Sequence, residues 1–242
     1  MTQGRGTAVV VGAGGGLGGA LLARLAQADP QRPLLALSRR PPDVLPDAAV
    51  WAHLDLTDEA TVAAAAERLD ALGPPDLVVV ATGRLHGEGL SPEKSWRSLS
   101  AEGLMAAFAV NAVGPALVAK HLLPRLPRDR RSVFAALSAR VGSIGDNRLG
   151  GWHAYRASKA ALNQLVRTLA IELARQRPQA ICVALHPGTV DTALSAPFQG
   201  GVAAETLFTP DFAAERLLAV LEGLTPADSG GFFAWDGAPI PW

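Results

Sequence analysis

One tyrosine and one lysine stand at a spacing that suits acid–base chemistry. The chain has a single tyrosine, Tyr155, and one of its three lysines, Lys159, follows four residues later in the run Tyr-Arg-Ala-Ser-Lys. On a helix this spacing places both side chains on one face. An ammonium beside a phenol favours the phenolate and lowers the pKa of the phenol, which assists proton transfer. We therefore predict that Tyr155 and Lys159 form a catalytic pair.

A glycine-rich loop near the start of the chain predicts a dinucleotide site. Residues 12–18 read Gly-Ala-Gly-Gly-Gly-Leu-Gly, between a predicted strand at Thr7–Val11 and a predicted helix at about Leu17–Ala28. Glycines in that context let the backbone approach a pyrophosphate, which then binds the N–H groups at the start of the helix. The loop residues that we expect at the cofactor are Gly12, Gly14, Gly15, Gly16, Leu17 and Gly18.

The identity of the dinucleotide depends on a position about 20 residues after the last glycine of the loop, where an acidic residue would bind the ribose 2′-hydroxyl. That position holds Ser38, followed by Arg39 and Arg40. A hydroxyl and two guanidiniums suit a 2′-phosphate, so the sequence predicts NADP(H) in preference to NAD(H). The alternative is an ordinary solvated loop, because arginine is common in this chain.

Short apolar runs alternate with longer Ala- and Leu-rich segments from end to end. This order predicts an α/β protein with one doubly wound parallel sheet, Rossmann-like and flanked by helices on both faces, in a single domain over residues 1–242. The predicted strands are Thr7–Val11, Pro33–Ser38, Val50–Leu54, Leu77–Ala81, Ser132–Leu137, Ile181–His186 and Gly231–Trp235. The predicted helices are Leu17–Ala28, Asp58–Leu72 (capped by Thr57), Glu102–Leu123, Tyr155–Arg175 and Phe212–Leu221.

Composition excludes several classes of protein. With 49% hydrophobic and 18% charged residues, the chain is not intrinsically disordered. Its 22 basic and 22 acidic residues balance, which predicts neither a nucleic-acid nor an anionic-membrane partner. The lone Cys182 cannot form an internal disulfide, and no signal peptide or uninterrupted apolar span of about 18 residues is evident, so we expect a cytoplasmic protein. The five histidines lack metal-ligand spacing, so no metal is expected.

Taken together, these motifs resemble the short-chain dehydrogenase/reductase family, classical type, over essentially the whole chain. The matching residues are Gly12, Gly16 and Gly18 of its cofactor loop, Asp55-Leu56 of its adenine-side motif, its helix asparagine Asn111, its pair Tyr155 and Lys159, and Pro187-Gly188 with Thr192 of its nicotinamide-side motif. The run 141–152 and the ending 235–242 are similar to the branch of C-factor and sniffer-like carbonyl reductases.

The resemblance implies an NADPH-dependent enzyme that reduces a ketone or aldehyde, with Tyr155 as proton donor and Lys159 also at the nicotinamide ribose. It adds further residues at the cofactor, namely Asp55, Leu56, Ala81, Thr82, Gly83, Asn111, Pro187, Gly188, Val190 and Thr192. A rival interpretation is a dinucleotide-binding signalling or regulatory protein of C-factor type with little turnover.

Two stretches depart from the family pattern. Residues 80–83 read Val-Ala-Thr-Gly, which keeps the glycine of the family's Asn-Asn-Ala-Gly but loses its polar cluster. An ungapped match also puts Ala139 where the family has its catalytic serine. Ser138 or Ser143 could supply the missing hydroxyl, and the alternation of side chains along a strand favours Ser143.

Pro115 supports a proton relay at Asn111. Inside a helix Pro115 has no N–H for the carbonyl of Asn111, four residues back, so that carbonyl could hold a water. The family relay from Tyr155 through Lys159 and water needs such an acceptor. A plain proline kink is the alternative.

The segment Thr192–Pro210 is expected to close over the substrate. Its apolar residues are Leu194, Pro197, Phe198, Val202, Leu207 and Phe208, which predicts a substrate that is apolar near the reacting carbon. Trp152 and Trp242 are candidates for the same cleft. We also expect a homo-oligomer, a tetramer or dimer, because the helices near Glu102–Leu123 and Tyr155–Arg175 are rich in Ala and Leu beyond one core-facing stripe and the family pairs them across a two-fold axis.

Overall fold

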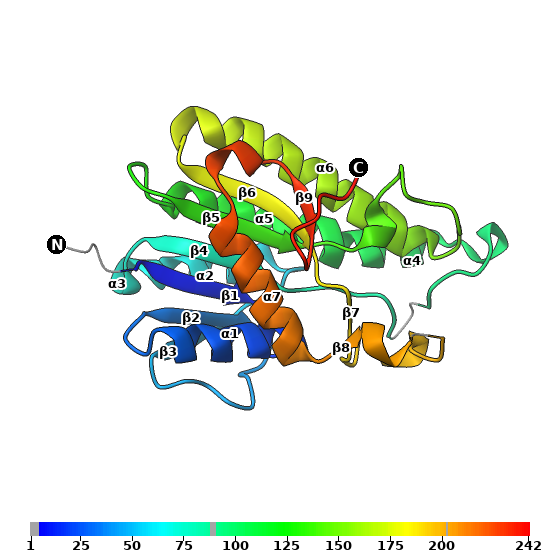
Figure 1. The fold of residues 1–242 in the computed structure, drawn as a ribbon, viewed down its shortest axis with the longest axis horizontal. Helices are drawn as coiled ribbons and strands as arrows, with labels where there is room; N and C mark the ends of the chain where they lie inside the picture. The colour runs from blue at the N-terminus through cyan, green and yellow to red at the C-terminus, as the bar shows by residue number, and fades with distance from the viewer. Residues whose placement is uncertain (1–4, 88–90, 202) are drawn as a thin grey trace.

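A seven-stranded parallel sheet forms the centre of the protein in a computed structural model that describes residues 5–87, 91–201 and 203–242. The strand order is β3-β2-β1-β4-β5-β6-β9, and every neighbouring pair is parallel (Figure 1). The strands are β1 (Thr7–Val11), β2 (Leu34–Ser38), β3 (Ala49–His53), β4 (Pro75–Val80), β5 (Ser132–Leu137), β6 (Ala180–His186) and β9 (Phe232–Ala234). The doubly wound α/β fold predicted from the sequence is therefore confirmed.

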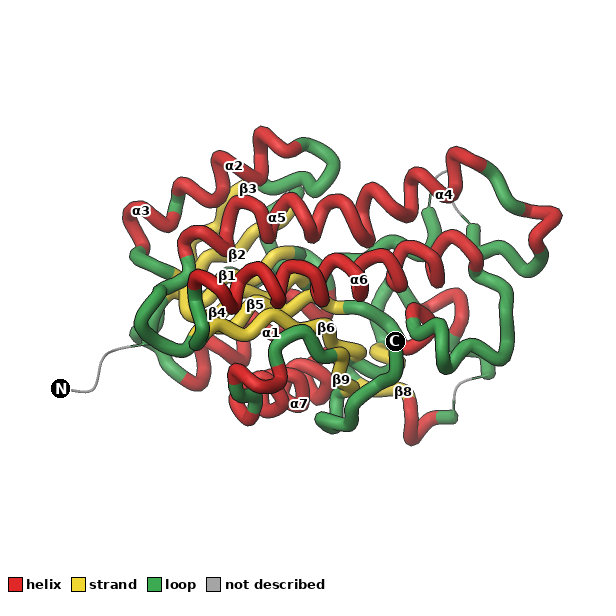
Figure 2. Tube along the Cα trace, turned by 90° about the horizontal axis from the view of Figure 1, so that it is seen from above, coloured by secondary structure: helices red, strands yellow, loops and turns green. Residues whose placement is uncertain are grey.

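Helices cover both faces of this sheet. In Figure 2, α2, α5 and α6 lie on one side of the strands, and α1 and α7 lie on the other. The helices are α1 (Gly16–Ala28), α2 (Glu59–Glu67), α3 (Leu69–Leu72), α4 (Ala101–Phe108), α5 (Gly114–Leu122), α6 (His153–Gln176) and α7 (Pro210–Gly223). Two buried apolar clusters, one on each face, account for the continuous apolar runs in the central strands.

The structure differs from the sequence-based elements in four respects. The helix predicted over Asp58–Leu72 tightens at Arg68, whose N–H donates to the Ala65 carbonyl three residues back, and splits into α2 and α3. Its N-cap is Asp58 rather than Thr57, because the Asp58 carboxylate accepts from the Ala60 N–H. A short parallel ladder of β7 (Thr189–Val190) and β8 (Leu207–Phe208) was not predicted.

The fourth difference lies between α4 and α5. The predicted long helix passes through one π-helical turn at Ala109–Val113 before α5 begins. By length and composition, the whole stretch Ala101–Arg125 is apolar enough to cross a membrane, with 39% of its most apolar window buried. The core helix of a soluble protein passes the same test, and in this fold α4 and the π turn pack along α6.

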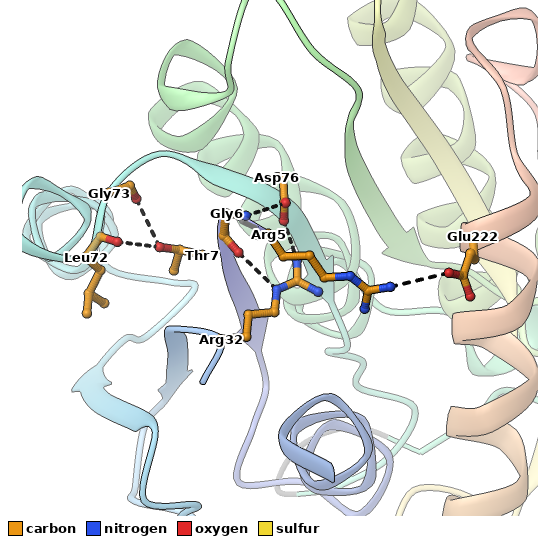
Figure 3. Close-up of polar contacts among 8 residues, drawn as sticks. All are labelled: Arg5, Gly6, Thr7, Arg32, Leu72, Gly73, Asp76 and Glu222. Carbon is orange, nitrogen blue, oxygen red and sulfur yellow. Dashed lines mark hydrogen bonds and ion pairs between the residues drawn. The ribbon is translucent and has the colours of Figure 1, made fainter. Parts of the chain in front are cut away.

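The amino ends of the strands are closed by polar contacts, which Figure 3 shows. Arg32 forms an ion pair with Asp76 and donates to the Gly6 carbonyl at 3.0 Å. The Thr7 hydroxyl donates to the carbonyl of Gly73 at 3.1 Å. These contacts join the starts of β1 and β4 to the residues just before β2. The carboxyl ends of the strands, where parallel sheets bind ligands, lie at the opposite ends of the same strands.

Candidate active site

A cleft of about 800 Å³ opens at the carboxyl ends of the strands. It is lined by the loops that follow β1, β4, β5 and β6 and by the first turns of α6. The predicted site residues that line it are Gly15, Gly16, Leu17, Gly18, Ala81, Thr82, Gly83, Ser138, Tyr155, Lys159, Pro187, Gly188, Val190 and Thr192. Those absent from its lining are Gly12, Gly14, Ser38, Arg39, Arg40, Asp55, Leu56, Asn111 and Ser143.

Two glycines of the loop between β1 and α1 have no room for a side chain. Gly12 has a φ of +91°, and a Cβ there would lie 2.8 Å from the Ala81 carbonyl oxygen. A Cβ at Gly18 would collide with the Gly12 carbonyl. The N-cap of α1, Gly15, has no side chain that could cap the first N–H groups of the helix. A bare loop in front of uncapped helical N–H groups fits the pyrophosphate of a dinucleotide.

The turn after β2 presents two arginines beside this loop. Arg39 and Arg40 are exposed, and within the described part of the chain neither forms an ion pair. A Cβ built at Gly14 would lie 3.1 Å from the Arg40 carbonyl oxygen, so the turn packs on the loop. Ser38 is different. Its buried hydroxyl donates to the Arg40 carbonyl at 2.5 Å and accepts from Trp51 Nε1 at 3.1 Å, so it holds the turn.

The predicted adenine-side residues, Asp55 and Leu56, make local contacts within the fold. Asp55 Oδ1 accepts from the backbone N–H and the hydroxyl of Thr57, and these bonds, with a smaller contribution from Arg39, lower the pKa of the Asp55 carboxyl. Leu56 is buried against Gly114, where a Cβ would lie 2.6 Å from the Leu56 Cβ. Both residues therefore serve the local structure, and neither lines the cleft.

Tyr155 and Lys159 lie on one face of α6 and line the same cleft. The Lys159 Nζ donates to the Leu137 carbonyl at 2.7 Å and lies 5.8 Å from the centre of the Tyr155 ring. Gly142 permits this position, because a Cβ there would lie 2.7 Å from the Lys159 Cβ. The end of β5 and the loop after it thus hold the lysine beside the tyrosine.

Burial controls the protonation of both groups. It raises the pKa of Tyr155 to about 12 and lowers the pKa of Lys159 to about 7. The expected depression of the Tyr155 pKa is therefore wrong for the protein alone, because desolvation of the phenolate outweighs the neighbouring amine. At neutral pH the phenol keeps its proton, and the amine titrates close to neutrality.

Of the two candidate serines, Ser138 lies at the cleft. Its hydroxyl is buried and has no hydrogen-bond partner among the described residues. Ser143 is buried away from the cleft, and its hydroxyl accepts from the Asp146 N–H at 3.1 Å. The alternation of side chains along a strand favoured Ser143, whereas the structure places Ser138 at the cleft. The reason is that β5 ends at Leu137, and both Ser138 and Ala139 line the cleft beyond that end.

Asn111 lies in the π turn, fully buried behind the cleft. Its side chain accepts from the Arg84 N–H at 2.7 Å and donates to the Arg84 carbonyl at 2.8 Å and to Ser158 Oγ at 3.0 Å. The amide thus ties the loop after β4 to α6, one residue before Lys159. Pro115 in the following turn has no N–H to donate, and π-helical turns occur often at functional sites.

The segment after β6 covers one side of the cleft. Phe198 makes an edge contact with Trp152, with ring centres 5.1 Å apart, and Trp152 makes another with Tyr155 at 6.3 Å. Leu194 also lines the cleft, whereas Val202 lies outside the described residues. Trp242 does not line the cleft, because its ring stacks on Phe232 at the end of the chain.

The polar residues of the cleft that sequence reasoning missed include Arg140, Arg148, Arg156 and His186. His186 ends β6, and its buried Nδ1 has no partner in the described part of the chain. Burial lowers its pKa to about 4, with Arg140 adding to the effect and Asp236 opposing it. The sequence marks these residues as cleft residues only by their positions, because they lie after β5, at the start of α6 or at the end of β6.

A Rossmann-like sheet, a bare glycine loop and a Tyr–Lys pair in one cleft define a dinucleotide-dependent oxidoreductase. A family model for short chain dehydrogenases matches residues 6–201, and the chain belongs to that family. The solved NADPH-bound carbonyl reductase from chicken fatty liver is 26% identical, with a TM-score of 0.84 over 98% of this chain and 99% of that chain. The carbonyl reductase Sniffer of D. melanogaster, 22% identical, shares the fold with a TM-score of 0.83 over 99% and 100%.

Two relatives known by sequence are also similar to this chain. C-signal of Myxococcus xanthus is 40% identical over 136 residues, which span 56% of this chain and 76% of that protein. The 1-hydroxy-2-glutathionyl-2-methyl-3-butene dehydrogenase of Rhodococcus sp. (strain AD45) is 31% identical over 189 residues, 78% of each chain.

Proposed function

We propose that the protein is an NADPH-dependent carbonyl reductase that converts a ketone or aldehyde into an alcohol, reversibly. The observation that carries the proposal is the position of Tyr155 and Lys159 in the cleft that also holds the glycine loop and the unpartnered Ser138 hydroxyl. NADPH, when bound, supplies the hydride. The exposed Arg39 and Arg40, which have no carboxylate partner among the described residues, support a preference for a cofactor with a 2′-phosphate.

The protein's own groups supply the proton and hold the substrate oxygen. The Tyr155 hydroxyl donates its proton to that oxygen, and the pKa of about 12 keeps the phenol protonated until reaction. Lys159, with a pKa of about 7, can return a proton to Tyr155 near neutral pH. The Ser138 hydroxyl donates a second hydrogen bond to the carbonyl oxygen and polarises it.

Tyr155→Phe tests the proposal, because it removes the proton donor and keeps the ring. We expect turnover of a carbonyl substrate to fall by about 10²–10⁴-fold while the Kd for NADPH, measured by nucleotide fluorescence, stays the same. The proposal fails if the variant keeps the parental turnover, or if no aldehyde or ketone in a broad panel drives NADPH oxidation.

A second candidate is a dinucleotide-binding regulatory protein with little turnover. Ala139 at the family's serine position and the similarity to C-signal favour it. Tight NADPH binding with no carbonyl turnover would support this second function. We further propose a cytoplasmic homo-oligomer that acts on a small molecule, without nucleic acid, membrane or metal.

A further inference from the structure

The opening of the cleft carries unbalanced positive charge. Three arginines and one carboxylate line it: Arg140, Arg148, Arg156 and Asp146. Arg140 Nε lies 3.6 Å from Asp146 Oδ2, so the charges of these two side chains offset one another. Within the described ranges, no carboxylate lies at ion-pair distance from Arg148 or Arg156.

Arg156 is held in place before any ligand arrives. It follows Tyr155 directly on α6, and its Nε and Nη1 donate to the carbonyls of Gly151 at 3.0 Å and Val141 at 3.2 Å. Carbonyls orient the guanidinium without cancelling its charge. A side chain that is already ordered loses little entropy when it binds an anion.

Several apolar side chains line the same cleft. Leu149, Trp152, Leu194 and Phe198 all line it, and Trp152 contacts the Tyr155 ring. A ligand that reaches Tyr155 therefore meets apolar surface near the reacting group. The exposed Arg148 lies on the loop between β5 and α6, at the solvent side of that surface.

The cofactor does not account for these arginines. Its phosphates are matched by the glycine loop after β1 and by the turn at Arg39 and Arg40 after β2. Arg148 and Arg156 follow β5 instead, on the far side of β4 in the sheet order. They line the same cleft as Tyr155.

We propose, on the basis of the reductase function above, that the substrate is an apolar carbonyl compound with an anionic group at its other end, bound by Arg148 and Arg156. A carboxylate and a phosphate share the chemistry that a guanidinium recognises, paired oxygens that accept two parallel N–H bonds.

The test compares three small molecules that share the same ketone and the same carbon chain and differ only in the terminal group. That group is a carboxylate, its methyl ester or a phosphate monoester. We expect the carboxylate or the phosphate to have a KM about tenfold lower than that of the ester. This advantage should shrink as salt is raised, since an exposed charge pair is screened. The anion that binds more tightly identifies the source of the charge.

Arg148→Ala should reduce the anion-to-ester ratio of kcat/KM by about three- to tenfold. The matched control is Arg175→Ala, an exposed arginine at the other end of α6, which should leave the ratio unchanged. Equal KM values for ester and anions, or an unchanged ratio in Arg148→Ala, would overturn the proposal.

Calorimetric titration of the same ligands into the protein–NADP⁺ complex separates this proposal from the reductase function. If no ligand is turned over but the anions bind about tenfold more tightly than the ester, the anion site stands and the reductase function fails. If the ketone ester is turned over but no ligand shows a charge preference, the reductase stands and the anion site fails.

Discussion

Ser138→Ala is the substitution that best tests which hydroxyl holds the substrate oxygen. The Ser138 hydroxyl is buried at the cleft and has no partner in the described part of the protein, so it is free to donate to a ligand. Loss of a preorganised donor to a developing oxyanion costs about 10²–10³ in kcat. Because in the proposed reaction Tyr155 also donates to that oxygen, we expect a smaller loss, about tenfold to hundredfold.

Ser143→Ala is the matched control, and it should affect stability instead. The Ser143 hydroxyl accepts from the Asp146 N–H, and its removal should lower the free energy of unfolding by about 1 kcal/mol. Removal of the Ser138 hydroxyl should not lower that free energy, because this hydroxyl has no partner among the described residues. The two variants therefore separate a functional hydroxyl from a structural one.

The assay pairs NADPH oxidation with urea denaturation of both variants. A third protein, Ser138→Ala with Ala139→Ser, moves the hydroxyl to the family position and should recover part of the lost turnover. The reasoning is refuted if Ser143→Ala abolishes turnover without loss of stability while Ser138→Ala keeps the parental rate.

Three further predictions concern the cofactor, the assembly and pH. Arg39→Ala should reduce the preference for NADPH over NADH about tenfold in Kd, and equal binding of both cofactors by the parent protein would contradict this. Light scattering should give a particle heavier than 25.1 kDa, and Met105→Glu, at an exposed apolar position of α4, should dissociate it. Because the pKa of His186 is about 4 in the fold and ordinarily 6.5, the free energy of unfolding should fall by about 3 kcal/mol as pH drops through that window, and His186→Asn should flatten the fall.

The parts of the fold that were predictable depend on local patterns. Every residue of β1 and of β5 is buried, as continuous apolar runs between helices require in a parallel sheet, and both ranges match the prediction. The shared face of Tyr155 and Lys159 follows from helical spacing within α6. Neither inference needs any knowledge of what packs against the element.

The loop between β5 and α6 could not be predicted in this way, because distant residues determine it. Trp152, just before α6, has a left-handed backbone with φ 51°, and its N–H donates to the Glu93 carbonyl at 2.6 Å. The Glu93 side chain also accepts from the Ala154 N–H at 3.2 Å. Contacts across some 60 residues of sequence leave no local signal, so strand alternation was extended past Leu137 and favoured the wrong serine for the cleft.

The protonation states of Tyr155 and Lys159 also could not be predicted from local sequence, because they depend on burial in the fold. From the sequence, only the neighbouring ammonium is visible, and it predicts a lower pKa for Tyr155. In the fold both groups are buried, and burial disfavours each charged form, so the pKa of the phenol rises while that of the amine falls. The pair is therefore neutral in the protein alone above about pH 7, with the proton on Tyr155, where reduction of a carbonyl needs it.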